Sequence, residues 1–285
     1  IFPIGGPSAL DVTTEERERE YEKRWHMGGL GLMGAFQDLQ VNQASNETAA
    51  EFVRSKIRKI VKDPEMARKL SPTNTFGCKR LCVATNYYET YNRDNISLID
   101  LNDTPIKCIT ANGVRTTNRD YDVDILILAT GFDAMTGALN RINIQGTNGQ
   151  KLTDAWRNGP VSYLGLGVNG FPNMFTITGP GSPSVLTNMI PTIEQHVNWI
   201  GACLVAMSKK NATRIEATKS AQSEWVAYNA GLADKSLRVT CNSWYLGANV
   251  SGKARVFMPF VGGLPMYIEK CEEVVREDYK GFVIT

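Results

Sequence analysis

The segment 123–137, VDILILATGFDAMTG, constrains the fold more than any other part of the chain. Residues 125–128 form an unbroken apolar run with β-branched side chains, which is typical of a strand buried on both faces of a parallel sheet. The run ends at Ala129-Thr130-Gly131, where small residues let the backbone turn close to a ligand. Ligands of open α/β sheets bind at the carboxyl ends of such strands. The segment therefore predicts an α/β protein with a ligand site at this turn.

A second segment with the same organisation lies at 174–207. An apolar stretch at 174–178 is followed by GPGSPS at 179–184 and then by an apolar helical pattern over 185–207, which Pro191 is expected to kink or restart. Two such junctions favour a cofactor-binding α/β protein. Two ordinary buried strands with tight turns would produce the same local pattern, so both interpretations stay open at this point.

Composition narrows the class of protein. The 285 residues are enough for two domains, and the net charge of +2 gives no reason to expect a nucleic-acid partner. No uncharged apolar run is long enough to span a membrane, and no signal peptide is evident, so we expect a cytoplasmic protein. The six cysteines form no C-x-x-C pair and the two histidines are far apart, which argues against a metal site. A chain that begins with Ile1 and a loop-like Gly5-Gly6-Pro7 is expected to be a fragment.

The remaining pattern divides into a charged helical part and a mixed part. Thr13-x-x-Glu16 has the form of a capping box, and Asp63-Pro64 is typical of a helix start. From about Phe76 short strands and a hairpin at Asn112-Gly113 are expected. The expected helices are 14–26, a second one from Ser45 or Asn46 to 61, one from Pro64, and 220–233; the expected strands are 97–101, 106–110, 114–116 and 256–258.

Gly29-Leu30-Gly31-Leu32-Met33-Gly34 matches the dinucleotide fingerprint G-x-G-x-x-G. The motif binds a pyrophosphate only when a strand precedes it and a helix follows. Here a charged helix precedes it, and Asp38 follows too soon to bind a ribose. We interpret the segment as a connection between helices.

Three further motifs each allow a functional and a structural interpretation. Lys79-Arg80 lies near the tyrosines 87 and 88. The pair could bind phosphate or a negatively charged intermediate. Alternatively, it is a solvated pair beside core tyrosines. Ser182-Pro183-Ser184 precedes an expected helix. The free amides at the start of that helix could stabilise an anion. Alternatively, Ser184 is an ordinary helix cap. The aromatic, Gly-rich segment 243–249 could close over a cofactor, or Trp244 is a buried loop residue.

Taken together, these motifs resemble the type I Baeyer–Villiger monooxygenases, which are FAD- and NADPH-dependent relatives of cyclohexanone and phenylacetone monooxygenase. The resemblance rests on ATGFDAMTG at 129–137, YLGLGVNGFPNMFTITGPGSPSVLTNM at 163–189, the Lys79-Arg80 pair, NYYETYNRDN at 86–95 and SWYLGAN at 243–249. It implies an α/β flavoprotein with two dinucleotide-binding domains and a helical insertion. The Gly-rich FAD and NADP fingerprints are absent, so the chain resembles only the C-terminal half.

The resemblance also implies a division of the chain into domains. Residues 1–75 match the helical insertion of the NADP domain, and 76–131 match the remainder of that domain. Residues 132–285 match the C-terminal part of the FAD domain, including its mobile loop.

The activity implied is oxygen insertion into a ketone to give an ester or lactone through a flavin C4a-peroxide, with molecular oxygen as co-substrate. Arg80 matches the catalytic arginine, Lys79 the residue that recognises the NADPH 2′-phosphate, and Trp244 the tryptophan that contacts the nicotinamide cofactor. The remaining matched positions lie near the flavin, in the substrate pocket, or in the interdomain link. They are Ser184, Val185 and Met189 near the flavin, Leu186 in the substrate pocket, and Thr130, Gly131 and Asp133 in the link.

Departures from the family pattern leave alternatives open. Leu81 and Ala84 stand where a proline and an acidic residue are expected, and Ser251 and Ala254 replace prolines of the mobile loop. One alternative is a related flavin monooxygenase that oxygenates sulfur or nitrogen. Another is a truncated, non-catalytic remnant that binds a partner. The isolated chain is expected to be inactive and, if truncated, to self-associate.

Overall fold

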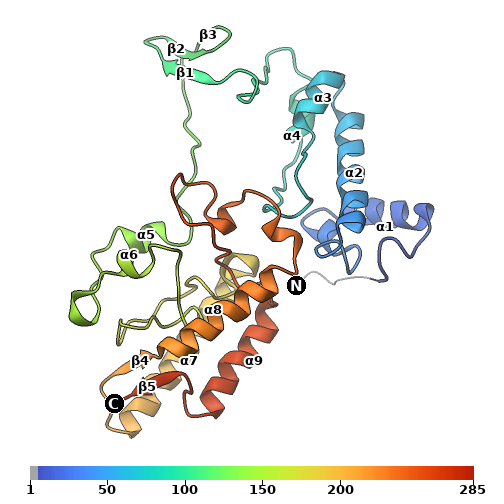
Figure 1. Ribbon diagram of the computed structural model, residues 1–285. Coiled ribbons are helices and arrows are strands. Elements are labelled where there is room, and N and C mark those ends of the chain that lie inside the picture. The colour runs from blue at the N-terminus through green and yellow to red at the C-terminus, as the bar shows by residue number, and fades with distance from the viewer. Residues whose placement is uncertain (1–5) are drawn as a thin grey trace. The chain divides into compact units, whose positions relative to one another are not determined.

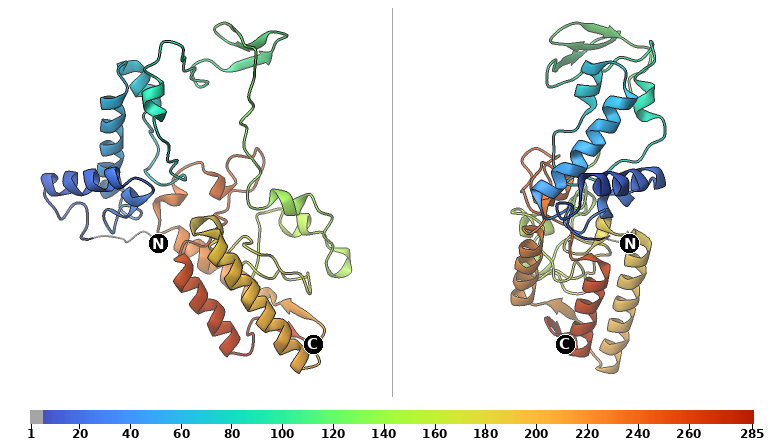
Figure 2. Two further views of the ribbon diagram at one scale, coloured as in Figure 1. Left: turned by 180° about the vertical axis from the view of Figure 1, so that it is seen from behind. Right: turned by 90° about the vertical axis from the view of Figure 1, so that its right-hand side faces the viewer.

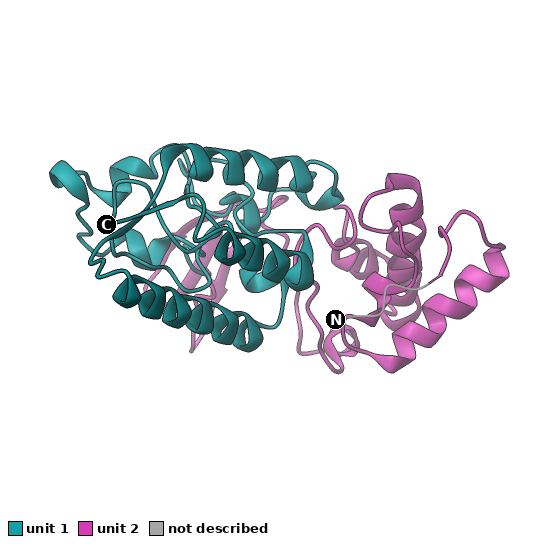
Figure 3. Ribbon diagram, turned by 90° about the horizontal axis from the view of Figure 1, so that it is seen from below, with its two compact units in different colours: residues 1, 132–285 teal, residues 2–131 magenta. Residues whose placement is uncertain are grey.

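The computed structural model describes residues 6–285 and consists of two compact units that meet in sequence between Gly131 and Phe132 (Figure 3). Ile1 and Gly5, which suggested a fragment, lie outside the described residues. Each unit has its own apolar core, so the two are described separately.

Helices are the main regular elements of the unit that ends at Gly131 (Figure 1). The capping box at Thr13 is confirmed, because the Thr13 hydroxyl accepts from the Glu16 amide and the Glu16 carboxylate accepts from the Thr13 amide. The second helix was expected to begin at Ser45 or Asn46, but the Asn42 side chain caps it earlier by accepting from the amides of residues 44 and 45. The helical elements are α1 (Thr14–Met27), η1 (Gly31–Gly34), α2 (Gln43–Ile60), α3 (Pro64–Leu70) and α4 (Tyr87–Thr90).

Asn46 joins the helices of this unit to the chain that follows them. Its side chain is fully buried and donates to the carbonyl oxygens of Leu39 (2.6 Å) and Phe76 (2.8 Å), while its own oxygen accepts from the Phe76 amide (2.9 Å). Three backbone groups buried in the core are thereby satisfied by one side chain, which makes Asn46 costly to replace.

A small antiparallel sheet follows, formed by β1 (Ile106–Ile109), β2 (Gly113–Thr116) and β3 (Asp120–Asp122). The predicted hairpin at Asn112-Gly113 is confirmed by the pairing of Ile109 with Val114. The strand predicted at 97–101 is wrong, since those residues form no ladder.

The buried strand predicted at 123–128 is also wrong. The segment is extended but unpaired, and Ile125, Ile127 and Leu128 are exposed by 79%, 82% and 72%. Only its first residue makes a ladder-like bond, from the Val123 amide to the Asn112 carbonyl, and residues 124–128 make none. A strand buried inside a parallel sheet needs neighbours on both edges, and the described residues supply none, so the apolar run has no pairing partner among them.

The unit from Phe132 to Thr285 contains the longest helix, α7 (Met189–Lys209), with α8 (Lys219–Ala233) and α9 (Gly263–Arg276) (Figures 1 and 2). Pro191 lies in the first turn of α7, where its missing amide has no intrahelical partner to lose, so it neither kinks nor restarts the helix. The strands β4 (Ile215–Ala217) and β5 (Phe282–Ile284) pair antiparallel. The shorter elements are α5 (Gly137–Asn140), η2 (Thr147–Gly149), α6 (Leu152–Ala155), η3 (Ser184–Leu186), η4 (Leu237–Val239) and η5 (Trp244–Leu246).

Aromatic side chains from α7, α8 and α9 fill the core of this unit. Trp225 stacks on Phe260 with ring centroids 5.3 Å apart, and Trp199 donates to the Cys271 carbonyl (3.1 Å). The fully buried His196 of α7 accepts from the Thr178 amide through Nδ1 (2.9 Å), and its Nε2 lies 2.8 Å from the Tyr267 hydroxyl. Burial lowers the pKa of His196 to about 4, because the charged form would lose its hydration.

Two strands predicted here are absent. Residues 174–178 form single bonds to other segments, such as the Thr176 amide to the Leu166 carbonyl, but no ladder. Residues 256–258 are likewise irregular. In both segments the apolar side chains are buried by packing against helices, so no neighbouring strand is needed to explain the apolar pattern.

Candidate functional site

The small-residue segment 179–184 is fixed in place by hydrogen bonds from three directions. The Gly181 amide donates to the Met258 carbonyl (2.7 Å), the Trp225 indole donates to the Gly181 carbonyl (3.0 Å), and the Ser162 hydroxyl donates to the Pro180 carbonyl (2.5 Å). Gly181 has φ 89°, and a Cβ there would lie 2.9 Å from the Ser162 hydroxyl. Glycine is required at this position by both backbone conformation and space.

The segment presents Ser184 in an unusual conformation. Ser184 is buried, has φ 41°, and its hydroxyl lies 3.9 Å from the Met135 sulfur. Positive φ at a non-glycine residue stores strain, which clusters at functional sites. The prediction that Ser184 caps the following helix is wrong, because η3 intervenes and the Asn188 side chain caps α7 at Ile190. Met189 is the first residue of α7 and is half-buried.

An apolar cluster brings the predicted flavin and substrate residues next to the predicted nicotinamide contact. Its buried members are Ala233, Tyr245 and Phe257. Val185, Leu186 and Trp244 pack against them and are only partly buried. These three residues come from two segments almost sixty positions apart, and the structure packs both segments against the same buried core.

The predicted mobile loop is tied to the start of the same unit. The Lys253 ammonium forms an ion pair with the Asp133 carboxylate and donates to the Ala134 carbonyl (3.0 Å). The Asn249 amide donates to the Phe132 carbonyl (2.8 Å). Phe132 and Asp133 therefore hold Asn249 and Lys253 respectively, and the side chains of the ion pair are largely buried.

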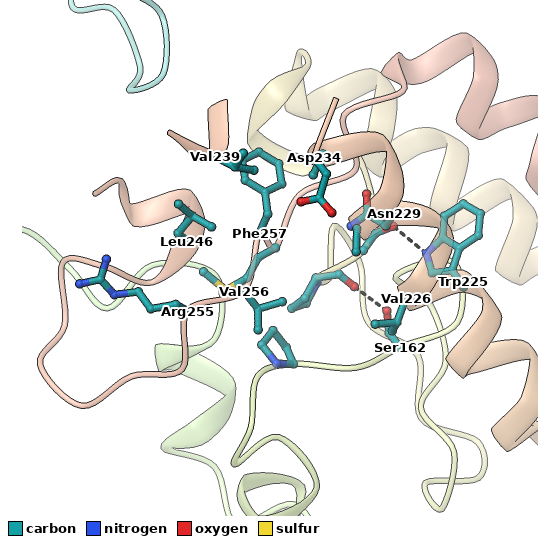
Figure 4. A pocket seen from close by; sticks show the side chains of 16 residues that line it. Ser162, Trp225, Val226, Asn229, Asp234, Val239, Leu246, Arg255, Val256 and Phe257 are labelled. Atoms are coloured by element: carbon teal, nitrogen blue, oxygen red, sulfur yellow. Dashed lines mark hydrogen bonds between the residues drawn. The ribbon is translucent and has the colours of Figure 1, made fainter. Parts of the chain in front are cut away.

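A cavity of about 250 Å³ lies beside this loop (Figure 4). One wall is α8, with Trp225, Val226 and Asn229, and the other is the loop residues 255–258. The lining is mainly apolar, with the carboxylate of Asp234 among its polar groups. The sequence alone did not indicate this cavity, because its walls come from separate segments.

Two buried hydroxyls beside the site lack a hydrogen-bond partner among the described residues. They are Ser243 Oγ and Thr136 Oγ1. Ser243 is the residue before Trp244 in the chain, and Thr136 is the residue after Met135. Buried polar groups are almost always paired, so hydroxyls left over here are available to a polar ring edge. The residues therefore fit the edge of a flavin or nicotinamide. Residues 6–285 offer no Gly-rich turn between a strand and a helix for a cofactor pyrophosphate, since α1 precedes residues 29–34 and η1 covers 31–34.

Lys79, Arg80, Thr130 and Gly131 belong to the other unit. Lys79 and Arg80 are exposed and directly follow the buried Phe76–Cys78 turn. Thr130 and Gly131 are exposed too, and Gly131 has φ 79° with open space around it. The structure groups Asp133, Ser184, Val185, Leu186 and Trp244 in the unit that begins at Phe132.

The motif around the tyrosines serves the fold of its unit. Tyr88 packs against Ile57 and Val61, and Asn92 closes the end of α2 by donating to the Ile60 carbonyl (2.8 Å) and accepting from the Lys62 amide (2.8 Å). Among the alternatives, this supports the structural interpretation for Tyr88.

Asp38 also has a structural partner set. It accepts from the hydroxyls of Ser8 (2.6 Å) and Ser45 (2.5 Å) and from the Ala9 amide (3.1 Å). Burial alone would raise the pKa of Asp38, but these hydrogen bonds outweigh it and hold the pKa below its usual value. The rejection of residues 29–34 as a dinucleotide fingerprint is consistent with this geometry.

Within residues 6–285, no group of three or more metal-ligating side chains gathers, and no helix is both long and apolar enough to cross a membrane.

Comparison with known proteins gives consistent relatives, although no family model matches the chain. Phenazine N-monooxygenase from Lysobacter antibioticus is 41% identical over 99% of this chain and 52% of its own length. Cyclohexanone 1,2-monooxygenase from Acinetobacter is 40% identical over 97% of this chain and 51% of its own length. The solved complex of OTEMO with FAD and NADP is 38% identical and matches 99% of this chain with a TM-score of 0.95, over 52% of its own length.

The fold and these similarities show that the chain resembles flavin-dependent monooxygenases over nearly all of its length. Within that class the chain resembles the Baeyer–Villiger monooxygenases and corresponds to the C-terminal half of the matched proteins. It spans about half the length of the curated relatives it matches. The predicted family and the predicted α/β, partial fold are both confirmed.

Proposed function

We propose that this chain is the C-terminal part of an FAD- and NADPH-dependent monooxygenase that inserts an oxygen atom from molecular oxygen into a ketone, giving an ester or lactone. When bound, the cofactors supply the electrons and activate the oxygen. The relatives named for cyclohexanone and for FAD and NADP support this proposal.

The proposed roles follow from the chemistry of each side chain. Arg80 carries a fixed positive charge that suits a negatively charged intermediate, and the exposed Lys79 provides a point charge for a 2′-phosphate. Trp244 offers an indole face to the nicotinamide. Ser184 and Val185, with Met189 at the start of α7, border the flavin ring, and Leu186 borders the substrate.

The domain assignment completes the proposal. Residues 1–75 are the helical insertion of an NADP domain and 76–131 its remainder, while 132–285 are the C-terminal part of an FAD domain. Thr130, Gly131 and Asp133 form the link between them. Since Asp133 also pairs with Lys253, the link is coupled to the loop that carries Trp244.

The gathering of Val185, Leu186 and Trp244 on one apolar cluster, beside unpaired buried hydroxyls, is the observation that carries this proposal. These residues supply ring contacts and exclude water. The described residues form no pyrophosphate-binding turn, so ring contacts are what they offer a cofactor. We therefore expect the isolated chain to bind FAD weakly or not at all.

The test is an absorbance spectrum of the purified chain before and after FAD is added. Free-flavin absorbance that is lost on desalting is the expected result. A stoichiometric flavin that survives desalting would contradict the expected weakness. Activity is then tested in the full-length parent with NADPH and a ketone panel, where Arg80→Lys should abolish ester formation. An unchanged product yield in that variant would remove Arg80 from the proposed role.

A second candidate reaction is N-oxygenation of an aromatic amine or heterocycle. The 41% identical phenazine N-monooxygenase favours it. Product analysis with phenazine against cyclohexanone separates the two reactions, because an N-oxide and a lactone differ in mass and polarity.

A further inference from the structure

The cavity between α8 and residues 255–258 takes no part in the proposed function. None of the residues proposed to contact the flavin, the nicotinamide cofactor or the ketone lines it. Its volume of about 250 Å³ is far above the roughly 15 Å³ that a single water molecule requires, so it has room for a small organic molecule. An apolar cavity with a few polar groups is the usual form of a small-molecule site. We call it the α8 cavity.

The walls of the α8 cavity are apolar and include two aromatic rings. Trp225 and Val226 come from α8, while Phe257 and Met258 come from the loop. The Trp225 indole N–H already donates to the Gly181 carbonyl (3.0 Å), so this donor is not available to a ligand. Such walls favour a ligand with an apolar body, and aromatic rings also attract a cation.

Two polar groups left over in the α8 cavity are hydrogen-bond acceptors. Asn229 is only 6% exposed; its amide nitrogen donates to the Pro259 carbonyl (3.3 Å), but its Oδ1 has no partner among the described residues. The Asp234 carboxylate pairs with no cation within residues 6–285. Figure 4 shows this carboxylate directed toward the space beside Phe257 and Asn229. Because a buried acceptor without a donor is costly, both groups favour a ligand that donates hydrogen bonds.

The electrostatics of the α8 cavity favour a positive charge. Helix α8 ends at Ala233 with Asp234 as its C-cap, and its last turn carries no basic side chain. The carbonyl oxygens at the C-terminus of a helix carry the negative end of the helix dipole, which stabilises a cation. Arg255 lines the cavity but donates to the Asn242 side chain (2.6 Å), and in Figure 4 its guanidinium points away from the cavity.

We propose that the α8 cavity binds a small organic ammonium ion, which is a protonated primary amine carried on an apolar ring. The ammonium group donates hydrogen bonds to Asn229 Oδ1 and to the Asp234 carboxylate, and the ring packs against the apolar walls. The same acceptors disfavour an anionic ligand. The proposal goes beyond the proposed function and does not rest on it, because binding requires no flavin and no residue with a proposed role in the reaction.

The experiment titrates the purified full chain with three probes of similar shape, using isothermal titration calorimetry at pH 7. The probes are the cation phenethylammonium, the neutral phenethyl alcohol and the anion phenylacetate. Phenethylammonium should bind at a single site per chain and about tenfold more tightly than phenethyl alcohol, because hydrogen bonds between charged groups are the stronger ones. Phenylacetate should bind most weakly.

Three variants locate the binding. Asp234→Asn removes the charge but keeps the shape, and should weaken phenethylammonium binding about tenfold while leaving phenethyl alcohol unchanged. Glu224→Gln is the matched control, since Glu224 is an exposed acid on the same helix that does not line the cavity, and binding should be unchanged. Ala230→Phe fills the cavity from an exposed position of α8 and should abolish binding of all three probes. Circular dichroism checks that each variant keeps its helix content.

Several results would overturn the proposal. Wild-type chain that binds no phenethylammonium, or binds it no better than phenethyl alcohol, would exclude an ammonium site. Equal losses in Asp234→Asn and Glu224→Gln would reduce the effect to the net charge of the chain. Binding that survives Ala230→Phe in a folded chain would place the probe elsewhere. Amine binding by a flavin-free chain supports the α8 cavity as a site, whatever the outcome of the flavin test.

Discussion

His196 should make the stability of this chain fall in mildly acidic solution. The imidazole is fully buried between the Thr178 amide and the Tyr267 hydroxyl, and its pKa is lowered from 6.5 to about 4. In the unfolded chain the imidazole takes up a proton near pH 6.5, whereas in the folded chain it stays neutral until about pH 4. The unfolded state therefore binds more protons between these values, so the stabilisation present above pH 6.5 is lost as the pH falls toward 4.

The magnitude follows from the two pKa values. Between pH 7 and pH 4.5 this single group should lower the free energy of unfolding by roughly 2 kcal/mol, since each unit of pKa difference corresponds to about 1.4 kcal/mol. Carboxylates with lowered pKa values, such as Asp38, lose stability in the same direction at lower pH. A variant that lacks only the imidazole separates the two contributions.

The assay is urea unfolding followed by tryptophan fluorescence at pH 7.0, 6.0, 5.0 and 4.5. His196→Gln should be less stable than wild type at pH 7 but should lose roughly 2 kcal/mol less on acidification. The matched control is His26→Gln, because His26 is the chain's other histidine and lies exposed on α1. If the free energy of unfolding falls equally with pH in wild type and in His196→Gln, the argument from burial is refuted.

Three further substitutions test the packing described above. Asn46→Ala should destabilise its unit by about 2–4 kcal/mol, because it leaves buried groups of Leu39 and Phe76 unpaired, and protection of the Phe76 amide in hydrogen exchange should fall with it. Gly181→Ala should lower the free energy of unfolding in urea by about 1–3 kcal/mol, because a side chain does not fit there. Gly201→Ala lies in an open helical position and should raise that free energy by about 0.5–1 kcal/mol. The reverse order of the two variants would contradict the geometry of these glycines. Lys253→Ala should speed thermolysin cleavage within 249–254, while Lys210→Ala, which removes an exposed ion pair, should not.

Local signals in the sequence predicted local structure well. The capping box at Thr13, the Asp63-Pro64 helix start and the Asn112-Gly113 turn depend on neighbours a few residues away, and all three are confirmed. Helix α8 appears within one residue of its predicted bounds. In each case the interactions that determine the element lie within the few residues of the motif itself.

Predictions that needed partners elsewhere in space failed or were missed. The run 125–128 has the composition of a central strand, but the ladder such a strand needs is not among the described residues. Lys253 gave no signal as a partner of Asp133, because the two residues are 120 positions apart. The cavity beside α8 is another case, since its walls meet only after folding. The roles of Arg80 and Lys79 stay predictions.

The unpaired segment 123–128 also affects how the chain behaves in concentrated solution. Its backbone amides and carbonyls lie along an extended apolar stretch, with Asp122 and Asp124 as the nearby charges. Open edges of this kind are templates on which further chains add as strands, and flanking charges act as gatekeepers against such growth. The two aspartates are thus the local protection of this segment against fibril-like assembly.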